Sequence, residues 1–230
     1  MYTQTIRYAR HYLANPVFLL LIFSSFCTGI LLVRIIWTDQ IRYIFLGWNL
    51  FLAWVPLLIT LFLNGRLKAG SQNKFYFSVG LLVWLLFLPN APYIITDLLH
   101  LKGNTHVPIW FDSILVFSFA LAGLLTGLFS LYLAHRIIDR LFSEFIGWIS
   151  IIACVGLAGF GVYLGRIERW NSWDLFTNPI RLLTDSLQQA TNPMAIKMTL
   201  AFTCLLLFFY LLFLSLVQLK THAPSEKYHP

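Results

Sequence analysis

Charged residues are scarce in this sequence. They make up only 11% of its 230 residues, whereas 59% are hydrophobic. One soluble core could not hide that much apolar surface, so the composition excludes an ordinary soluble domain. We therefore expect an all-α integral membrane protein, for which a lipid bilayer is the solvent.

Cysteine is also scarce, and its positions exclude two kinds of small scaffold. Cys27, Cys154 and Cys204 each lie inside an apolar run, without the spacing of metal ligands and without the even count of a disulfide framework. The formal net charge is +7, but the 16 Lys and Arg residues stand singly between apolar runs. That scatter argues against a nucleic-acid partner.

Long apolar runs are abundant, and five of them are long enough to cross a membrane. A hydrocarbon core of about 30 Å needs roughly 20 helical residues. Asn-Pro pairs open the first and last runs, with a capping side chain followed by proline at the first helical position. The predicted spans are Pro16–Ile36, Ile41–Leu63, Ser113–Ala134, Phe145–Gly165 and Pro193–Leu219.

A sixth run, Phe75–Leu88, has only 14 residues and would reach about 21 Å, too short to cross alone. Pro89 and Pro92 follow it, and then a short apolar stretch to Leu101. The pattern predicts one span over 75–101, broken at the prolines and restarted as a helix that Asn90 caps. Because lipid cannot satisfy freed backbone groups, we expect the break to face inward.

Six spans place both termini on one side of the membrane. If that side is the cytoplasm, nine basic residues lie inside and seven outside, which agrees with the positive-inside rule. We expect residues 1–220 to form a single polytopic membrane domain and residues 221–230 a disordered tail. The connections at 64–74 and 135–144 are predicted to be basic turns.

A surface helix is predicted between the fifth and sixth spans. Asn178-Pro179 opens it, and Ile180, Leu183 and Leu187 fall on one stripe. Such a stripe is typical of a helix that lies along the membrane interface.

Polar residues gather on the side opposite the termini. Tyr93, Asp97 and His100 would share one face of the restarted helix, and ionisable groups at membrane depth usually pair with something. Arg34 and Arg42 are candidate partners, and Asn49 would lie about 12 Å inside the second span. The residues of the expected polar pocket are Asn49, Asn90, Tyr93, Asp97, His100, Asp112, Arg166, Arg169, Asn171, Trp173 and Asp174.

Asp97, His100 and Asp112 are also candidate ligands of a divalent metal, with His106 or Asp174 completing the set. The alternative is a structural hydrogen-bonded pair, because Asp and His at i, i+3 often occur by chance. No cofactor is predicted, and a divalent metal is left open.

Arg166 and Arg169 would share a helical face if the fifth span continued that far. Two guanidinium groups there could clamp a phosphate or carboxylate. Alternatively, the two arginines are satisfied by Glu168, Asp174 and bulk phospholipid, beside tryptophans that form an aromatic belt.

Glycines four residues apart occur in two spans, at Gly123 and Gly127 and at Gly161 and Gly165. Such pairs let helix backbones approach closely. We expect them to pack helices within the chain and not to form a dimer.

Four segments resemble a known family. They are Asn49–Pro56 (NLFLAWVP), Leu88–His100 (LPNAPYIITDLLH), Trp110–Asp112 (WFD) and Gly165–Asp174 (GRIERWNSWD). Together they resemble the bacterial membrane proteins grouped as domain of unknown function 1361. The resemblance implies several spans in a bacterial plasma membrane, and it implies no activity or catalytic residue.

The sequence thus favours a membrane protein whose outward-facing polar pocket binds a lipid headgroup or another anionic envelope component. A membrane-embedded hydrolase or transferase, metal-dependent or not, is one alternative, so enzymatic activity stays open. A small carrier or an accessory subunit of a transporter is another. Convergence of the carboxylates with His100 would favour a metal site, whereas ion pairs with Arg34, Arg166 or Arg169 would favour a structural or binding cluster.

Overall fold

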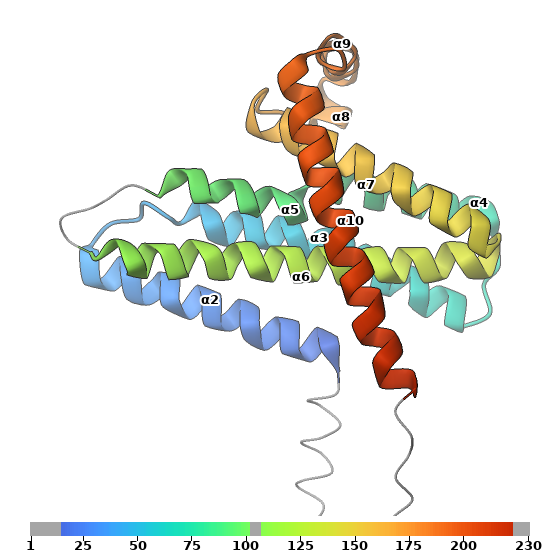
Figure 1. Ribbon diagram of the computed structural model, residues 1–230, viewed down its shortest axis with the longest axis horizontal. Coiled ribbons are helices and arrows are strands. Elements are labelled where there is room, and N and C mark those ends of the chain that lie inside the picture. Colours follow the sequence, from blue (N-terminus) through green and yellow to red (C-terminus); the bar gives the residue numbers. More distant parts are fainter. Residues whose placement is uncertain (1–14, 102–106, 223–230) are drawn as a thin grey trace, which may run out of the picture. The chain divides into compact units, whose positions relative to one another are not determined.

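The computed structural model describes residues 15–101 and 107–222, with side chains to residue 218, and every element in these ranges is helical (Figure 1). Six helical segments are long and apolar enough to cross a membrane. They are α2 (Pro16–Thr38), α3 (Phe45–Lys68), the run Lys74–His100, α6 (Ile109–Leu141), α7 (Glu144–Arg166) and α10 (Pro193–His222), whose candidate span is Pro193–Gln218. The predictions of an all-helical membrane protein and of six spans are confirmed.

The described residues divide into two compact units. One contains residues 15–59, 82–101 and 107–127, and the second contains 60–81 and 128–222. Three of the long segments, α3, the run 74–100 and α6, contribute residues to both units. The expectation of one membrane domain stays a prediction, and the expected tail beyond His222 lies outside the described residues.

Helix starts agree with the predicted caps more closely than helix ends do. Asn15 accepts the N–H of Val17 at 3.0 Å, and Pro16 occupies the first turn. The second span begins at Phe45 and not at Ile41, because residues 42–44 form a turn that buries Tyr43. Asn49 therefore lies about 6 Å into its helix instead of about 12 Å.

The two connections predicted as basic turns are shorter than expected, because the helices run on. α3 ends at Lys68, where Gly70 has φ +89° and the N–H of Ser71 bonds the carbonyl of Arg66 at 3.1 Å. That is the helix-ending bond pattern for which glycine is the favoured residue. α6 continues to Leu141, so only Phe142 and Ser143 separate it from α7.

The proline break interrupts the third span, but the backbone keeps right-handed helical geometry at Pro89 and Ile94. α4 (Lys74–Phe87) is followed by α5 (Asn90–Tyr93) and by the 3-10 helix η1 (Ile94–His100). The N–H of Ala91 bonds the carbonyl of Leu88 at 3.2 Å, three residues back, whereas in an α-helix it would bond the carbonyl of Phe87.

That shift frees the carbonyl of Phe87, and the side chain of Asn90 donates to it at 2.9 Å. Asn90 therefore satisfies a carbonyl at the end of α4. The prediction that Asn90 caps the restarted helix is wrong. The restart is also a 3-10 helix over most of its length. The prediction that Tyr93, Asp97 and His100 share one face of an α-helix is therefore wrong. In a 3-10 helix residues three apart share a face, as Asp97 and His100 do, whereas Tyr93 stands four residues before Asp97.

The break packs against α6, and glycine makes the contact possible. Ala91 is completely buried, as is Ile94. A Cβ atom at Gly123 would lie 2.8 Å from the carbonyl oxygen of Ala91, and one at Gly127 would lie 2.7 Å from the Ala91 Cβ. The expected inward-facing break and the packing role of this glycine pair are both confirmed.

In the second unit, α7 packs against α10. The close approach occurs at Gly159, where an added Cβ would lie 2.8 Å from the carbonyl oxygen of Thr199. The spacing pattern pointed to Gly161 and Gly165 in this helix and not to Gly159, which has no glycine or serine partner four residues away.

Replacing Gly123 with Ala should lower the free energy of unfolding by about 1–3 kcal/mol, because the new methyl group must displace the backbone of Ala91. Gly29→Ala is the matched control, since a Cβ at Gly29 meets nothing within 4 Å. Both variants are measured by denaturation of the purified protein in mixed micelles. Equal stability of the two variants would contradict the close approach.

Candidate functional site

A buried ion pair joins α2 to α6 in the first unit. The Nε of Arg34 donates to Oδ1 of Asp112 at 2.9 Å, and a second guanidinium nitrogen lies 3.4 Å from Oδ2. The exposed fractions of the two side chains are 0% and 2%. Arg34 also donates to the carbonyl of Gln40 at 3.3 Å, so the two-pronged pair also fixes the loop after α2.

Tyr43 lies beside this pair and is completely buried. Its ring stacks on two guanidinium groups, with the Cζ of Arg34 4.6 Å and that of Arg42 5.3 Å from the ring centroid. Burial raises the pKa of the Tyr43 phenol above its usual value, and the Asp112 carboxylate raises it further while the two arginines oppose the shift. The phenol therefore stays protonated at neutral pH.

Asp97 is a second buried carboxylate, 1% exposed. The amide nitrogen of Asn49 donates to its Oδ2 at 2.7 Å. Nδ1 of His100 lies 3.9 Å from its Oδ1, and the His100 side chain is 47% exposed. The carboxylate is thus held inside the unit while the imidazole reaches its surface.

The backbone of His100 links the Asp97 carboxylate to the residues beside the Arg34–Asp112 pair. Its carbonyl lies 3.4 Å from a guanidinium nitrogen of Arg42 and 3.5 Å from the hydroxyl of Tyr43. The ring of Phe45 packs on the imidazole, with centroids 5.2 Å apart. The residues that we call the polar cluster are Arg34, Arg42, Tyr43, Asn49, Asp97, His100 and Asp112.

Of the eleven predicted pocket residues, six belong to the first unit. Four of these, Asn49, Asp97, His100 and Asp112, lie in the polar cluster. Tyr93 is half-buried on the broken span, and Asn90 serves the backbone as described. Across the described residues, no group of three or more His, Cys, Asp or Glu side chains is placed to hold a metal ion. His106, named as a possible ligand, lies outside them.

The other five predicted residues belong to the second unit. α7 ends at Arg166, and Arg169 follows with φ +61°, so the premise of one helical face carrying both arginines is wrong. Asp174 accepts the backbone N–H of Asn171 at 2.7 Å and the hydroxyl of Thr177 at 3.2 Å. This carboxylate closes a turn before α8 (Asp174–Thr177), and Trp173 beside it is 38% exposed.

The predicted surface helix is α9 (Pro179–Gln189), and its apolar stripe is open. The exposed fractions of Ile180, Leu183 and Leu187 are 80%, 57% and 75%. Gln189 anchors its end, where Oε1 accepts the hydroxyl of Tyr163 at 2.9 Å and the amide of Asn192 at 2.7 Å. An anchored helix with an open apolar stripe suits the membrane interface.

Two groups of polar residues were missed by sequence reasoning. Tyr43 lies in a turn that was predicted as helix. Its neighbour Arg42, a candidate partner of the polar residues, was the one sign in the sequence that this turn belongs to the site. In the second unit, Nδ1 of His135 lies 2.7 Å from the hydroxyl of Tyr210, and Nε2 lies 3.5 Å from Oδ1 of Asp139. His135 and Asp139 stand four residues apart, a spacing that could have shown the pair.

The long apolar helices and the buried polar cluster define a multi-pass α-helical membrane protein. No curated protein and no solved structure matches the chain. The chain belongs to the family described as Protein of unknown function (DUF1361), which matches residues 48–213. The resemblance noted from four segments is therefore confirmed. The matched range includes all eleven predicted pocket residues, whereas Arg34, Arg42 and Tyr43 precede it.

Replacing Asp112 with Asn should lower the free energy of unfolding by roughly 3–5 kcal/mol, because Arg34 keeps a buried charge without a carboxylate. The apolar double variant Arg34→Met/Asp112→Leu should be more stable than Asp112→Asn, since it leaves no charge unpaired. Denaturation in mixed micelles measures both. Wild-type stability of Asp112→Asn would show that the pair is not formed.

A spin label at position 183 should contact lipid, and one at position 188 should contact water. Leu183 lies on the apolar stripe of α9, whereas Gln188 is exposed on a polar face of the same helix. Power saturation in liposomes should give more collisions with oxygen at 183 and more with a water-soluble nickel chelate at 188. The same chelate accessibility at both positions would place α9 away from the bilayer.

Proposed function

We propose that this protein is a binding protein of a bacterial plasma membrane, with both termini in the cytoplasm, and that its polar cluster engages the anionic headgroup of a membrane lipid or envelope component. The observation that carries the proposal is the charge distribution within the cluster. One arginine is neutralised inside the unit, and the other is left at its surface.

Arg34 is neutralised by Asp112 and has no access to solvent. Arg42 is only half-buried, and within the described chain it forms no ion pair; its contacts are the His100 carbonyl and the Tyr43 ring. Stacking on Tyr43 holds the guanidinium in place while N–H groups stay available. A preformed guanidinium suits a phosphate or carboxylate oxygen.

Aromatic residues near the polar cluster support a position at the membrane boundary. Trp37 and Trp110 flank Phe111, with ring centroids 5.8 Å from it in both cases, and both tryptophans are more than half exposed. Trp48, close to the start of α3, is also more than half exposed. Tryptophan is enriched at headgroup depth, so Arg42 would meet headgroups and not acyl chains.

The ion pair between Arg34 and Asp112 was the feature expected of a binding or structural cluster, and it supports that hypothesis over a metal site. Because Asp112 pairs with Arg34, only Asp97 and His100 remain of the three candidate metal ligands. The metal-dependent hydrolase or transferase and the small carrier stay predictions.

Arg42→Gln should weaken binding of phosphatidylglycerol by about tenfold, because a charge-assisted hydrogen bond contributes roughly 1.5 kcal/mol. Native mass spectrometry of the detergent-solubilised protein with added phosphatidylglycerol counts the bound lipids and gives their affinities. Arg42→Lys should keep part of the binding, since it retains the charge and loses the flat guanidinium.

Arg136→Gln is the matched control, because Arg136 is also an arginine stacked on a tyrosine, 5.8 Å from the Tyr132 ring, and belongs to the second unit. It should bind phosphatidylglycerol as the wild type does. Equal losses in the two variants, or no loss in Arg42→Gln, would refute the proposal. Phosphatidylcholine, which carries no net charge, tests selectivity for anions.

A further inference from the structure

A cavity in the second unit is lined by two basic residues, and none of its lining residues belongs to the polar cluster. Its volume is about 280 Å³, and it is formed where α3 ends, α4 begins and α6 ends. All five lining residues belong to the second unit: Leu67, Gln72, Lys74, Arg140 and Leu141. None of them is acidic.

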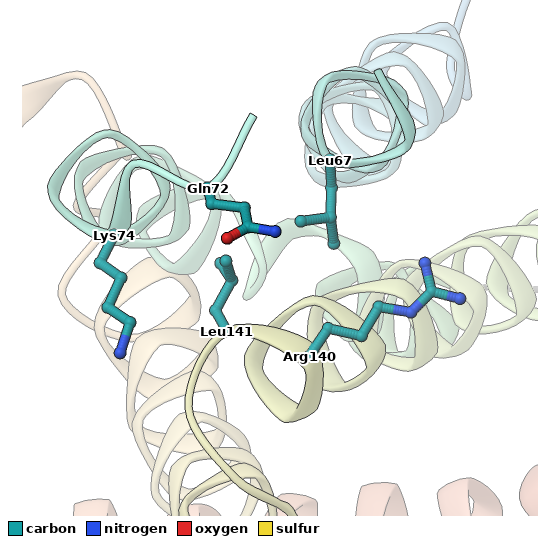
Figure 2. A pocket seen from close by; sticks show the side chains of 5 residues that line it. All are labelled: Leu67, Gln72, Lys74, Arg140 and Leu141. Carbon is teal, nitrogen blue, oxygen red and sulfur yellow. The ribbon is translucent and has the colours of Figure 1, made fainter. Parts of the chain in front are cut away.

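Figure 2 shows how the five side chains lie. The amide of Gln72 lies at the centre beside Leu67 and Leu141. Lys74 and Arg140 lie on opposite sides of it, and neither charged end points at the Gln72 amide. The Nζ of Lys74 lies 5.2 Å from the Phe142 ring centroid. Within the described part of the chain, neither cation forms an ion pair with a carboxylate.

We propose that this cavity binds the phosphate group of an anionic phospholipid or of a soluble phosphate compound. The cavity lies where the candidate spans Phe45–Lys68 and Ile109–Leu141 end and Lys74–His100 begins, and the ends of spans are where lipid headgroups lie. Ammonium and guanidinium groups are the donors that phosphate oxygens accept best.

The apolar part of the lining suits an amphiphile. Leu67 and Leu141 offer aliphatic carbons that a glycerol backbone can contact. Lys74 and Arg140 are both exposed, so their long side chains can turn from the positions in Figure 2 to reach the phosphate. Phe75 and Phe142, the next residues along the chain after Lys74 and Leu141, are exposed at 79% and 40%, as expected at the edge of a bilayer.

The variant Lys74→Gln/Arg140→Gln tests the cavity against general surface charge. Its affinity for phosphatidylglycerol at this site should fall about 100-fold, because it loses two charge-assisted hydrogen bonds to the phosphate, each a factor of about ten as for Arg42. Arg66→Gln/Lys68→Gln is the matched control, since it removes two exposed cations from the last turn of α3 without changing the lining. Equal losses in the two double variants would overturn the proposal.

A second readout does not depend on any variant. A lysine-acylating reagent should modify Lys74 more slowly when phosphatidylglycerol replaces phosphatidylcholine in nanodiscs, whereas Lys68 should react at an unchanged rate, as read by mass spectrometry. Protection by inorganic phosphate alone would identify a soluble phosphate as the ligand. No protection of Lys74 by either compound would refute the site.

The cavity is independent of the proposed function, because the two sites share no residue. Native mass spectra distinguish them: Arg42→Gln should lose one bound lipid and keep the one at the cavity. The Lys74→Gln/Arg140→Gln variant should show the reverse.

Discussion

The ion pair between Arg34 and Asp112 is the interaction on which the first unit depends. A guanidinium group in an apolar environment is tolerated only when it is paired and its remaining N–H groups are satisfied. The pair meets both conditions through Asp112 and the Gln40 carbonyl. It thereby links α2 to α6 and fixes the loop that presents Tyr43 and Arg42.

The same rule, that polar groups away from water need partners, explains the broken span. Two prolines remove N–H donors, and the chain responds with a tighter backbone bond at Ala91 and a side-chain bond from Asn90. Glycines in α6 then let the break approach closely enough to be covered by protein. The segment that carries Asp97 and His100 is thus held on one side by α6 and on the other by Asn49.

Much of this fold could be predicted from the sequence, because span length and apolar composition are set by the bilayer. The Asn-Pro starts of α2 and α10 and the surface helix α9 were also predictable, since each rests on local chemistry. Helix ends were harder: the continuation of α3 to Lys68 depends on the conformation of Gly70, and the continuation of α6 on packing. Local sequence does not contain that information.

The site was predicted less completely, for a related reason. Candidate partners for Asp97 and Asp112 were named from span order, but only the structure assigns Arg34 to Asp112 and Asn49 to Asp97. The segment Arg166–Asp174 carries charges and tryptophans that suggested one clamp, yet Arg169 leaves the helix and Asp174 closes a local turn. Charge patterns show where polar groups gather and do not show which of them satisfy one another.

The proposed function requires that Asp112 holds Arg34 away from water, so that Arg42 is the cation available to a ligand. Nitrogen-15 NMR of arginine side chains in nanodiscs tests this most directly, with the signals assigned by Arg34→Lys and Arg42→Lys. We expect a slowly exchanging Nε–H for Arg34 that exchanges rapidly in Asp112→Asn. An Arg34 Nε–H that exchanges with water as fast as an exposed arginine would contradict the account.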